Sequence, residues 1–356
     1  MTLNRLLITA VLLAIGAAGA ALAAQTLMPM PWLLGALIAA ALMAGTGQHG
    51  WLSGYSFPHP LRAGFITVIG VMIGAQVTPQ LLGQIGALGY TLPAMALFIP
   101  LAHTGNYLIF RKYGGYDRAT AFFSGTPGGL MESIALGEIS RADIRILTLQ
   151  QFLRIILVIS LLPLGLSIYY GTPVGSASTV ISGGPAVALW PNLPLVAVLA
   201  GVGFALARIV HLPAGQLIGP LVLTGAASAM GWVTLTVPPP LVEIAQVVVG
   251  VSLGMRFLGV TWALLRRSFG LALLSVLWML ILAAAIAEVL YLVTGIGFGA
   301  LLISFAPGGV TEMSLVALSL AINPAFVSLH HTLRILMTVV ALTLAARLLG
   351  FDKPPP

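Results

Sequence analysis

Two short stretches of the sequence carry one pattern: Ser124-Gly-Thr-Pro127-Gly128-Gly129-Leu-Met-Glu132 and Ser304-Phe-Ala-Pro307-Gly308-Gly309-Val-Thr-Glu312. The copies lie 180 residues apart, and each places Pro-Gly-Gly and a glutamate inside an otherwise apolar segment. Proline lacks an amide hydrogen and glycine weakens helices, so each copy predicts an interrupted helix. At membrane depth, such an interruption persists only where it is buried in protein or lines a water-filled cavity.

The composition indicates a membrane protein with many crossings. Charged residues make up 6% of the 356 residues, hydrophobic residues make up 59%, and the mean hydropathy is +1.07. These values lie far from those of soluble globular domains. The 15 Lys and Arg residues are scattered between apolar segments, which argues against a nucleic-acid partner. The chain has no cysteine and its six histidines show no metal-ligand spacing, so we expect no metal and no other cofactor.

Ten hydrophobic segments are long enough to cross a bilayer, for which about 20 residues are needed. They lie at 4–26, 31–46, 61–79, 84–110, 146–169, 193–209, 214–231, 240–260, 269–292 and 325–348. The two Pro-Gly-Gly regions, 119–139 and 299–321, are additional and interrupted. The predicted fold is therefore an all-α polytopic membrane protein.

The sequence contains two copies of one unit. Gly19-Ala-Ala-Leu-Ala23 aligns with Gly203-Phe-Ala-Leu-Ala207 at an offset of 184, and Gln150-Gln151-Phe-Leu-Arg154 aligns with His330-His331-Thr-Leu-Arg334 at 180. We expect a first transmembrane repeat at 1–170, a linker at 171–192, a second repeat at 193–350 and a C-terminal tail at 351–356. The first segment resembles a signal peptide, but its counterpart in the second repeat argues against removal.

Glycine pairs recur at matching positions of the two repeats. Gly70-Val-Met-Ile-Gly74 aligns with Gly250-Val-Ser-Leu-Gly254 at an offset of 180. Small residues four apart let transmembrane helices approach closely, so we expect these glycines to form packing surfaces rather than ligand contacts.

The distribution of positive charge predicts that the second repeat is inverted. With a cytoplasmic N-terminus and Pro-Gly-Gly segments that enter and leave on one side, every loop carrying Lys or Arg becomes cytoplasmic. This arrangement gives five crossings in each repeat, and an odd number inverts the second copy. We therefore expect a bacterial-type inner membrane protein with both termini cytoplasmic. A broken helix and a re-entrant hairpin are hard to separate by hydropathy, and if segment 31–46 does not cross, spanning broken helices become an alternative to re-entrant hairpins.

The two motif glutamates are the strongest candidates for a binding role. Only eight residues of the chain are acidic, and Glu132 and Glu312 occupy the same place in the two copies. Each is expected near the first turn of the half-helix that restarts after the glycines, where a carboxylate is favoured. Intramembrane carboxylates usually mark substrate or ion pathways. The alternative is that each glutamate caps a helix end or pairs with an arginine.

Polar residues follow each motif at equivalent depth. Arg154 and Arg334 lie well inside their segments, and each is expected to neutralise the glutamate of its own repeat, to contact an anionic substrate, or to extend to the membrane surface. The residues before them differ between the repeats, since Gln150 and Gln151 correspond to His330 and His331. A histidine here either carries protons or is a hydrogen-bonded packing residue.

The doubled PWLLG-like, Pro-Gly-Gly-x-x-Glu and LxLR elements resemble the membrane proteins with an AbrB-type duplication, over about residues 5–348. Members of that family are labelled AbrB family transcriptional regulators or ammonia monooxygenases, and the family is placed near cation:proton antiporters and anion transporters. No segment resembles the small soluble AbrB DNA-binding domain. A monooxygenase would need copper or iron ligands at recognisable spacing, and the sequence does not supply them.

The sequence therefore predicts a secondary transporter that works by alternating access, and not an enzyme. Its partners would be the lipid bilayer and a small polar solute, with an anion slightly favoured, coupled to a proton or cation; self-association is left open. The predicted site comprises Pro127, Gly128, Gly129, Glu132, Pro307, Gly308, Gly309, Glu312, Arg154, Arg334, Gln150, Gln151, His330 and His331. A membrane sensor that affects gene expression is the main alternative, and a membrane monooxygenase is a weaker one.

Overall fold

The computed structural model describes residues 3–47, 50–75, 86–171, 189–210, 214–233, 235, 239–320 and 322–351. Over these residues the secondary structure is helical, and none of them forms a strand. The chain divides into two compact units, and each unit takes residues from both predicted repeats. The first comprises Met1–Leu82, Pro163–Thr261 and Ser314–Ala325, and the second comprises Gly83–Leu162, Trp262–Met313 and Phe326–Pro356.

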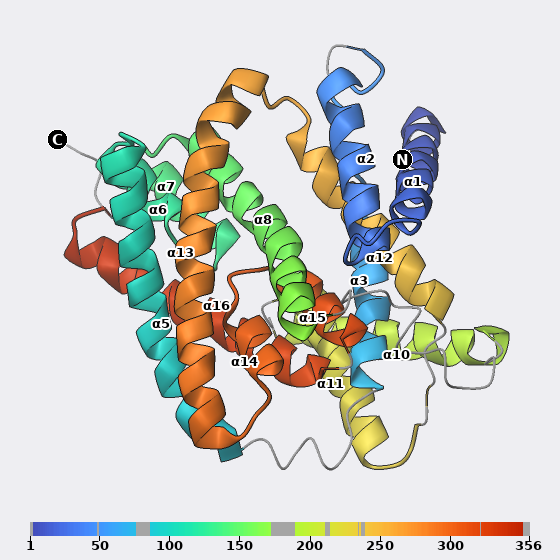
Figure 1. Ribbon diagram of the computed structural model, residues 1–356. Helices are drawn as coiled ribbons and strands as arrows, with labels where there is room; N and C mark the ends of the chain where they lie inside the picture. Colours follow the sequence, from blue (N-terminus) through green and yellow to red (C-terminus); the bar gives the residue numbers. More distant parts are fainter. Residues whose placement is uncertain are drawn as a thin grey trace. The chain divides into compact units, whose positions relative to one another are not determined.

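The first unit is built from two groups of three helices (Figure 1). The groups are α1 (Leu3–Ala23), α2 (Pro31–Gly47) and α3 (His59–Gly74), then α10 (Leu189–Ile209), α11 (Gly215–Ala229) and α12 (Pro239–Gly254). A short 3₁₀ turn, η3 (Met255–Phe257), follows α12.

Glycines bring these helices together in matched pairs. A Cβ on Gly35 of α2 would overlap the carbonyl of Gly19 on α1, and a Cβ on Gly219 of α11 would overlap the carbonyl of Gly203 on α10. The second contact repeats the first at an offset of 184. Because the backbones touch, no larger residue fits without displacing a helix.

A second pair of close contacts joins helices of different repeats. Gly250 of α12 lies against the carbonyl of Leu33 on α2, and Gly70 of α3 lies against the carbonyl of Leu217 on α11. The pattern recurs one turn later on both helices. The prediction that the aligned glycine pairs form packing surfaces is confirmed. Each of these close contacts is therefore formed by one helix from the first repeat and one helix from the second.

The second unit contains the interrupted segments and the helices around them (Figure 1). Its elements are α5 (Leu88–Leu108), the π-helical turn η2 (Ile109–Tyr113), α6 (Arg118–Ser124), α7 (Leu130–Ile139), α8 (Ile144–Tyr170), α13 (Trp262–Thr294), α14 (Phe298–Phe305), α15 (Val310–Ser319) and α16 (Pro324–Leu348). Helices α8, α15 and α16 are divided between the two units. Within the second unit α13 packs against both α5 and α14.

The predicted segments agree with the helices. Each of the ten uninterrupted segments contains a helix among its described residues, and each Pro-Gly-Gly region is two short helices, α6 with α7 and α14 with α15. Seven helices of the described chain are long and apolar enough to span a membrane, which identifies a multi-pass membrane protein. Crossing by α2, α3 and α11, which are 17, 16 and 15 residues long, stays a prediction.

The predicted repeat boundaries also stay a prediction. Most of the expected linker, 172–188, and most of the expected tail, 352–356, lie outside the described residues. Each compact unit mixes the two halves of the sequence, so a repeat and a compact unit are different divisions of this chain.

Candidate functional site

The first break separates α6 from α7. The helix ends at Ser124, and the chain restarts as a helix only at Leu130. Gly129 precedes α7 with φ 65°, a left-handed conformation that a residue with a side chain rarely adopts. The prediction that Pro-Gly-Gly interrupts this helix is therefore confirmed.

The second break separates α14 from α15 with a different backbone. Helix α14 ends at Phe305 and α15 begins at Val310. The amide of Gly308 donates to the carbonyl of Ala306 at 2.9 Å, and neither Gly308 nor Gly309 has a positive φ. The two copies of the motif thus break their helices in different ways.

Each motif glutamate folds back over the second glycine of its own motif. Glu132 and Glu312 lie in the first turns of α7 and α15, as predicted. A Cβ on Gly129 would come within 3.3 Å of Oε2 of Glu132, and a Cβ on Gly309 would overlap the carboxylate of Glu312. The second glycine therefore leaves room for the carboxylate at the start of the half-helix. Glu312 is buried, whereas Glu132 is partly exposed.

Arg334 donates hydrogen bonds to the main chain of the second break. This side chain is 1% exposed, and its guanidinium donates to three carbonyls of the break: Phe305 at 3.5 Å, Ala306, and Gly308 at 2.7 Å. Broken helices leave carbonyls without helical partners, and an arginine offers five donors in a planar fork that can satisfy several of them.

Arg154 has the corresponding role at the first break with fewer contacts. The side chain is buried, and Nη1 donates to the carbonyl of Thr126 at 2.6 Å. The contacts of Arg154 and Arg334 with the described residues run to main-chain carbonyls and to His331, and none runs to a carboxylate. The two guanidiniums are close enough for their charges to repel. Both Nε atoms are buried without a hydrogen-bond partner in the described chain.

Gln151 and His331 are equivalent residues that support the same breaks. Gln151 Nε2 donates to the carbonyl of Phe123 at 3.2 Å and to Oγ1 of Thr126 at 2.8 Å. His331 Nε2 bonds to the carbonyl of Ile303 at 2.9 Å. The amide of the first repeat and the imidazole of the second thus bind main-chain groups at matching places.

The contacts of His331 determine its protonation. Its Nδ1 lies 3.0 Å from Nη2 of Arg334, which can only donate, so Nδ1 must accept. The carbonyl of Ile303 can only accept, so the proton is on Nε2 and the ring is neutral. His331 can take up a second proton only after its contact with Arg334 is broken.

Gln150 and His330 point away from the breaks. Gln150 Nε2 donates to the hydroxyl of Tyr116 at 2.8 Å and to the carbonyl of Ser268 at 3.3 Å. His330 bonds through one ring nitrogen to Oγ1 of Thr91 and through the other to the carbonyl of Phe326, each at 2.8 Å. These two predicted site residues therefore tie α8 and α16 to other parts of the unit.

The predicted site left out polar residues of α5 that contact the first break; Asn106 is only a weak candidate from the sequence, and His103 was not proposed. Asn106 of α5 donates to the carbonyl of Gly125 at 3.0 Å, and its own oxygen accepts from Ser275 of α13 at 2.8 Å. His103, one turn earlier on α5, makes a backbone hydrogen bond at Gly125. A polar residue recurring on one face of an apolar helix was the available signal, since His103 and Asn106 are three residues apart.

Metal binding finds no support in the geometry. Among the residues the structure describes, no three His, Asp or Glu side chains come together as metal ligands would. That the protein uses no metal or other cofactor stays a prediction.

Comparison with known proteins places the chain in a family. The family described as "Transition state regulatory protein AbrB" matches residues 50–350. The chain belongs to the AbrB family. The chain is also 24% identical to the uncharacterized protein YhjN of Bacillus subtilis (strain 168), over 95% of this chain and 92% of that protein. The "putative regulator AbrB" of Escherichia coli (strain K12) is 24% identical, over 92% of each chain.

The match confirms the resemblance seen in the motifs. It covers both Pro-Gly-Gly-x-x-Glu copies and both buried arginines. The chain described here contains seven helices long and apolar enough to span a membrane, and its described residues contain none of the β-structure expected for a small soluble DNA-binding domain.

Proposed function

We propose that this protein is a secondary transporter for a small polar solute, preferentially an anion. The observation that carries the proposal is the pair of buried arginines, Arg154 and Arg334, at two broken helices of one unit. Their hydrogen bonds to carbonyls offset part of the cost of burying a guanidinium but leave its net charge in place. A mobile anion would supply the missing charge and would meet the amide ends of two half-helices.

The glutamates would couple transport to a proton or cation. Glu132 and Glu312 begin the half-helices on the far side of each break, next to the glycines that shape it. A carboxylate there can gain a proton or bind a cation, which changes the charge that the arginines and the solute experience. Coupling then requires that the occupied and empty glutamates favour different conformations of the transporter.

The matched helix contacts support an inverted repeat. Within the first unit, the contact of Gly250 with Leu33 recurs as that of Gly70 with Leu217, with the two repeats exchanged. Such reciprocal contacts are expected of two copies related by a twofold axis, and the charge pattern favours an axis in the membrane plane. Together with the distribution of Lys and Arg, these reciprocal contacts favour five crossings in each repeat, cytoplasmic termini and an inner-membrane location.

Cysteine labelling tests the inverted topology. The chain has no cysteine, so single cysteines can be placed at Ser140, after α7, and at Ser178, in the expected linker. With re-entrant motif segments, a membrane-impermeant maleimide should modify the two positions from opposite sides of the membrane. The cysteine-free parent is the control for background labelling. Modification of both positions from the same side would refute the re-entrant arrangement.

Flux measurements test the transport function. Proteoliposomes on a solid-supported membrane should give saturable currents with members of a panel of acetate, isovalerate, benzoate, succinate, glutamate, phosphate and sulfate. An imposed pH gradient should change the size of those currents. Protein-free liposomes are the control, and currents no larger than theirs across the panel would overturn the anion-transport proposal.

A regulatory role is the second candidate, and it rests on names alone. The family description and the E. coli relative both carry the word regulatory or regulator. Ligand binding by the purified protein, without flux in the liposome assay, would favour a membrane sensor. No feature of the site favours enzymatic chemistry, and we propose that the protein is not an enzyme.

A further inference from the structure

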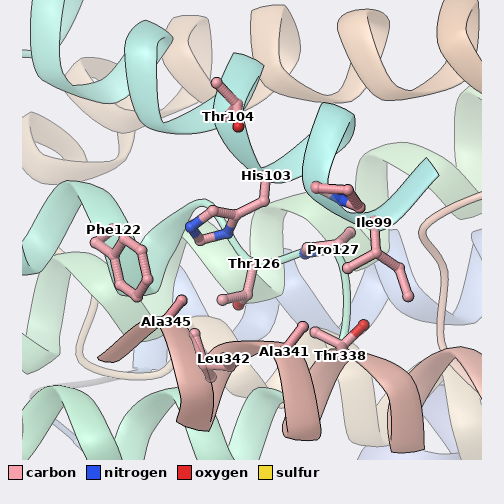
Figure 2. Close-up of a pocket in the computed structure, with 11 residues that line it drawn as sticks. Ile99, His103, Thr104, Phe122, Thr126, Pro127, Thr338, Ala341, Leu342 and Ala345 are labelled. Carbon is pink, nitrogen blue, oxygen red and sulfur yellow. The ribbon is translucent and has the colours of Figure 1, made fainter. Parts of the chain in front are cut away.

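The second unit contains a cavity beside the first break. Its volume is about 270 Å³, just below the range of about 300–1,000 Å³ for small-molecule sites. Figure 2 shows His103 pointing from α5 toward Phe122 and Thr126, with the α16 residues on the opposite side of the space. The lining residues are Ile99, Pro100, His103, Thr104, Phe122, Thr126, Pro127, Thr338, Ala341, Leu342 and Ala345.

Two polar atoms in the cavity wall lack partners. Nε2 of His103 and Oγ1 of Thr338 are both buried and make no hydrogen bond with the part of the chain that the structure describes. Other threonines of α16 behave differently, because the hydroxyls of Thr332 and Thr343 each donate to the carbonyl four residues back at 2.8 Å. Thr338 is only 2% exposed, and an unpaired buried hydroxyl costs free energy unless a ligand engages it.

The cavity adjoins the charged centre of the site. A Cβ on Gly128 would lie 3.4 Å from Oγ1 of Thr338 and 3.8 Å from Nε of Arg334, so both atoms flank this glycine. Arg334 and Thr338 are one turn apart and therefore share a face of α16. Arg334 does not line the cavity, but its unpartnered Nε lies on the same side of α16 as Thr338, and this positive charge favours a negatively charged ligand group beside Thr338.

Apart from Thr104 and Thr126, the rest of the wall is apolar. Ile99, Phe122, Leu342 and Ala345 line it, and the Phe122 ring meets the His103 ring edge-on at a centroid separation of 4.5 Å. A second charged group on the ligand would be buried there without a partner, which is strongly unfavourable. The ligand should therefore have one charged end and a small apolar body.

We propose that this cavity binds a small monocarboxylate, with its carboxylate at Thr338 and His103 and its apolar body among Phe122, Leu342 and Ala345. The hydroxyl of Thr338 donates to the carboxylate. When Nε2 of His103 carries no hydrogen, it accepts a hydrogen bond from the protonated (acid) form of the ligand. When Nε2 is protonated, it donates a hydrogen bond to the carboxylate anion. The assignment of this ligand as the transported solute rests on the proposed function, whereas the binding site itself does not.

Binding to purified full-length protein tests the proposal, with isovalerate as the probe. Calorimetry should show saturable binding of isovalerate but none of isovaleramide, which has the same shape without the charge, or of succinate, which has a second carboxylate. Binding of isovaleramide as tight as that of isovalerate, or failure of wild-type protein to bind isovalerate, would overturn the monocarboxylate assignment.

Two matched pairs of variants locate the site. Thr338→Val removes only the hydroxyl and should weaken isovalerate binding about tenfold without lowering the unfolding temperature, while Thr343→Val should bind like wild type. Ala341→Leu should fill the cavity and abolish binding, while Val340→Leu, at the exposed neighbouring position, should not. Wild-type affinity in both Thr338→Val and Ala341→Leu would refute the site.

The same variants separate this proposal from the transport function. Isovalerate binding that depends on Thr338, without flux, would leave the site standing and overturn transport. Anion flux that is unchanged in Thr338→Val and Ala341→Leu would leave transport standing and overturn the assignment of this ligand as the transported solute.

Discussion

Arg334→Met should destabilise the protein by several kcal/mol and abolish anion currents. Methionine approximates the volume of the arginine but donates no hydrogen bond, so the carbonyls of Phe305, Ala306 and Gly308 lose their donor. Each buried group left unpaired costs about 1–3 kcal/mol. The measurement is the thermal unfolding of purified protein in detergent, alongside the liposome currents.

Arg154→Met is the matched comparison. Arg154 makes one hydrogen bond, to the carbonyl of Thr126, and Gln151 Nε2 also approaches that carbonyl at 3.4 Å. The loss of stability should therefore be smaller, about 1–3 kcal/mol. Equal destabilisation by the two substitutions, or a wild-type unfolding temperature for Arg334→Met, would contradict the roles assigned to these arginines.

Glu132→Gln and Glu312→Gln should each reduce flux by about tenfold or more, because each removes the only ionisable group of its motif. The amide keeps the shape of the carboxylate, so the close packing against Gly129 and Gly309 is preserved and the unfolding temperature should stay near that of wild type. Initial rates in proteoliposomes, with and without a pH gradient, measure the effect.

Glu138→Gln is the control for the glutamate variants. Glu138 lies at the exposed end of α7, away from the break, and its substitution should leave the rate unchanged. Wild-type rates in both motif variants would show that these carboxylates only cap their half-helices. A reduced rate in Glu138→Gln as well would point to a general effect of surface charge.

The sequence was sufficient to predict the helices and the breaks. Apolar length determines where a helix can cross a membrane, and the properties of Pro127 and Gly129 are local, so neither needs knowledge of the fold. The placement of Glu132 and Glu312 in the first turn of a half-helix followed from counting three residues past the second glycine.

The partners of the buried polar groups could not be predicted in the same way. Arg154 and Arg334 were expected to meet a glutamate, a substrate or the membrane surface, whereas the structure gives them main-chain carbonyls. Asn106 bonds to both Gly125 and Ser275, and Ser275 follows Asn106 by 169 residues along the chain. Such contacts depend on which helices become neighbours, and hydropathy and spacing within a segment do not contain that information.

The glycine contacts of the first unit constrain how the protein is made. Helices α2 and α3 emerge early in synthesis, yet their closest partners, α12 and α11, belong to the second half of the chain. The first half must therefore remain in the bilayer with its packing surfaces uncovered until the ribosome has finished the second. Neither half on its own contains the partner for these surfaces, so the gene cannot be divided at the linker without the two products finding each other in the membrane.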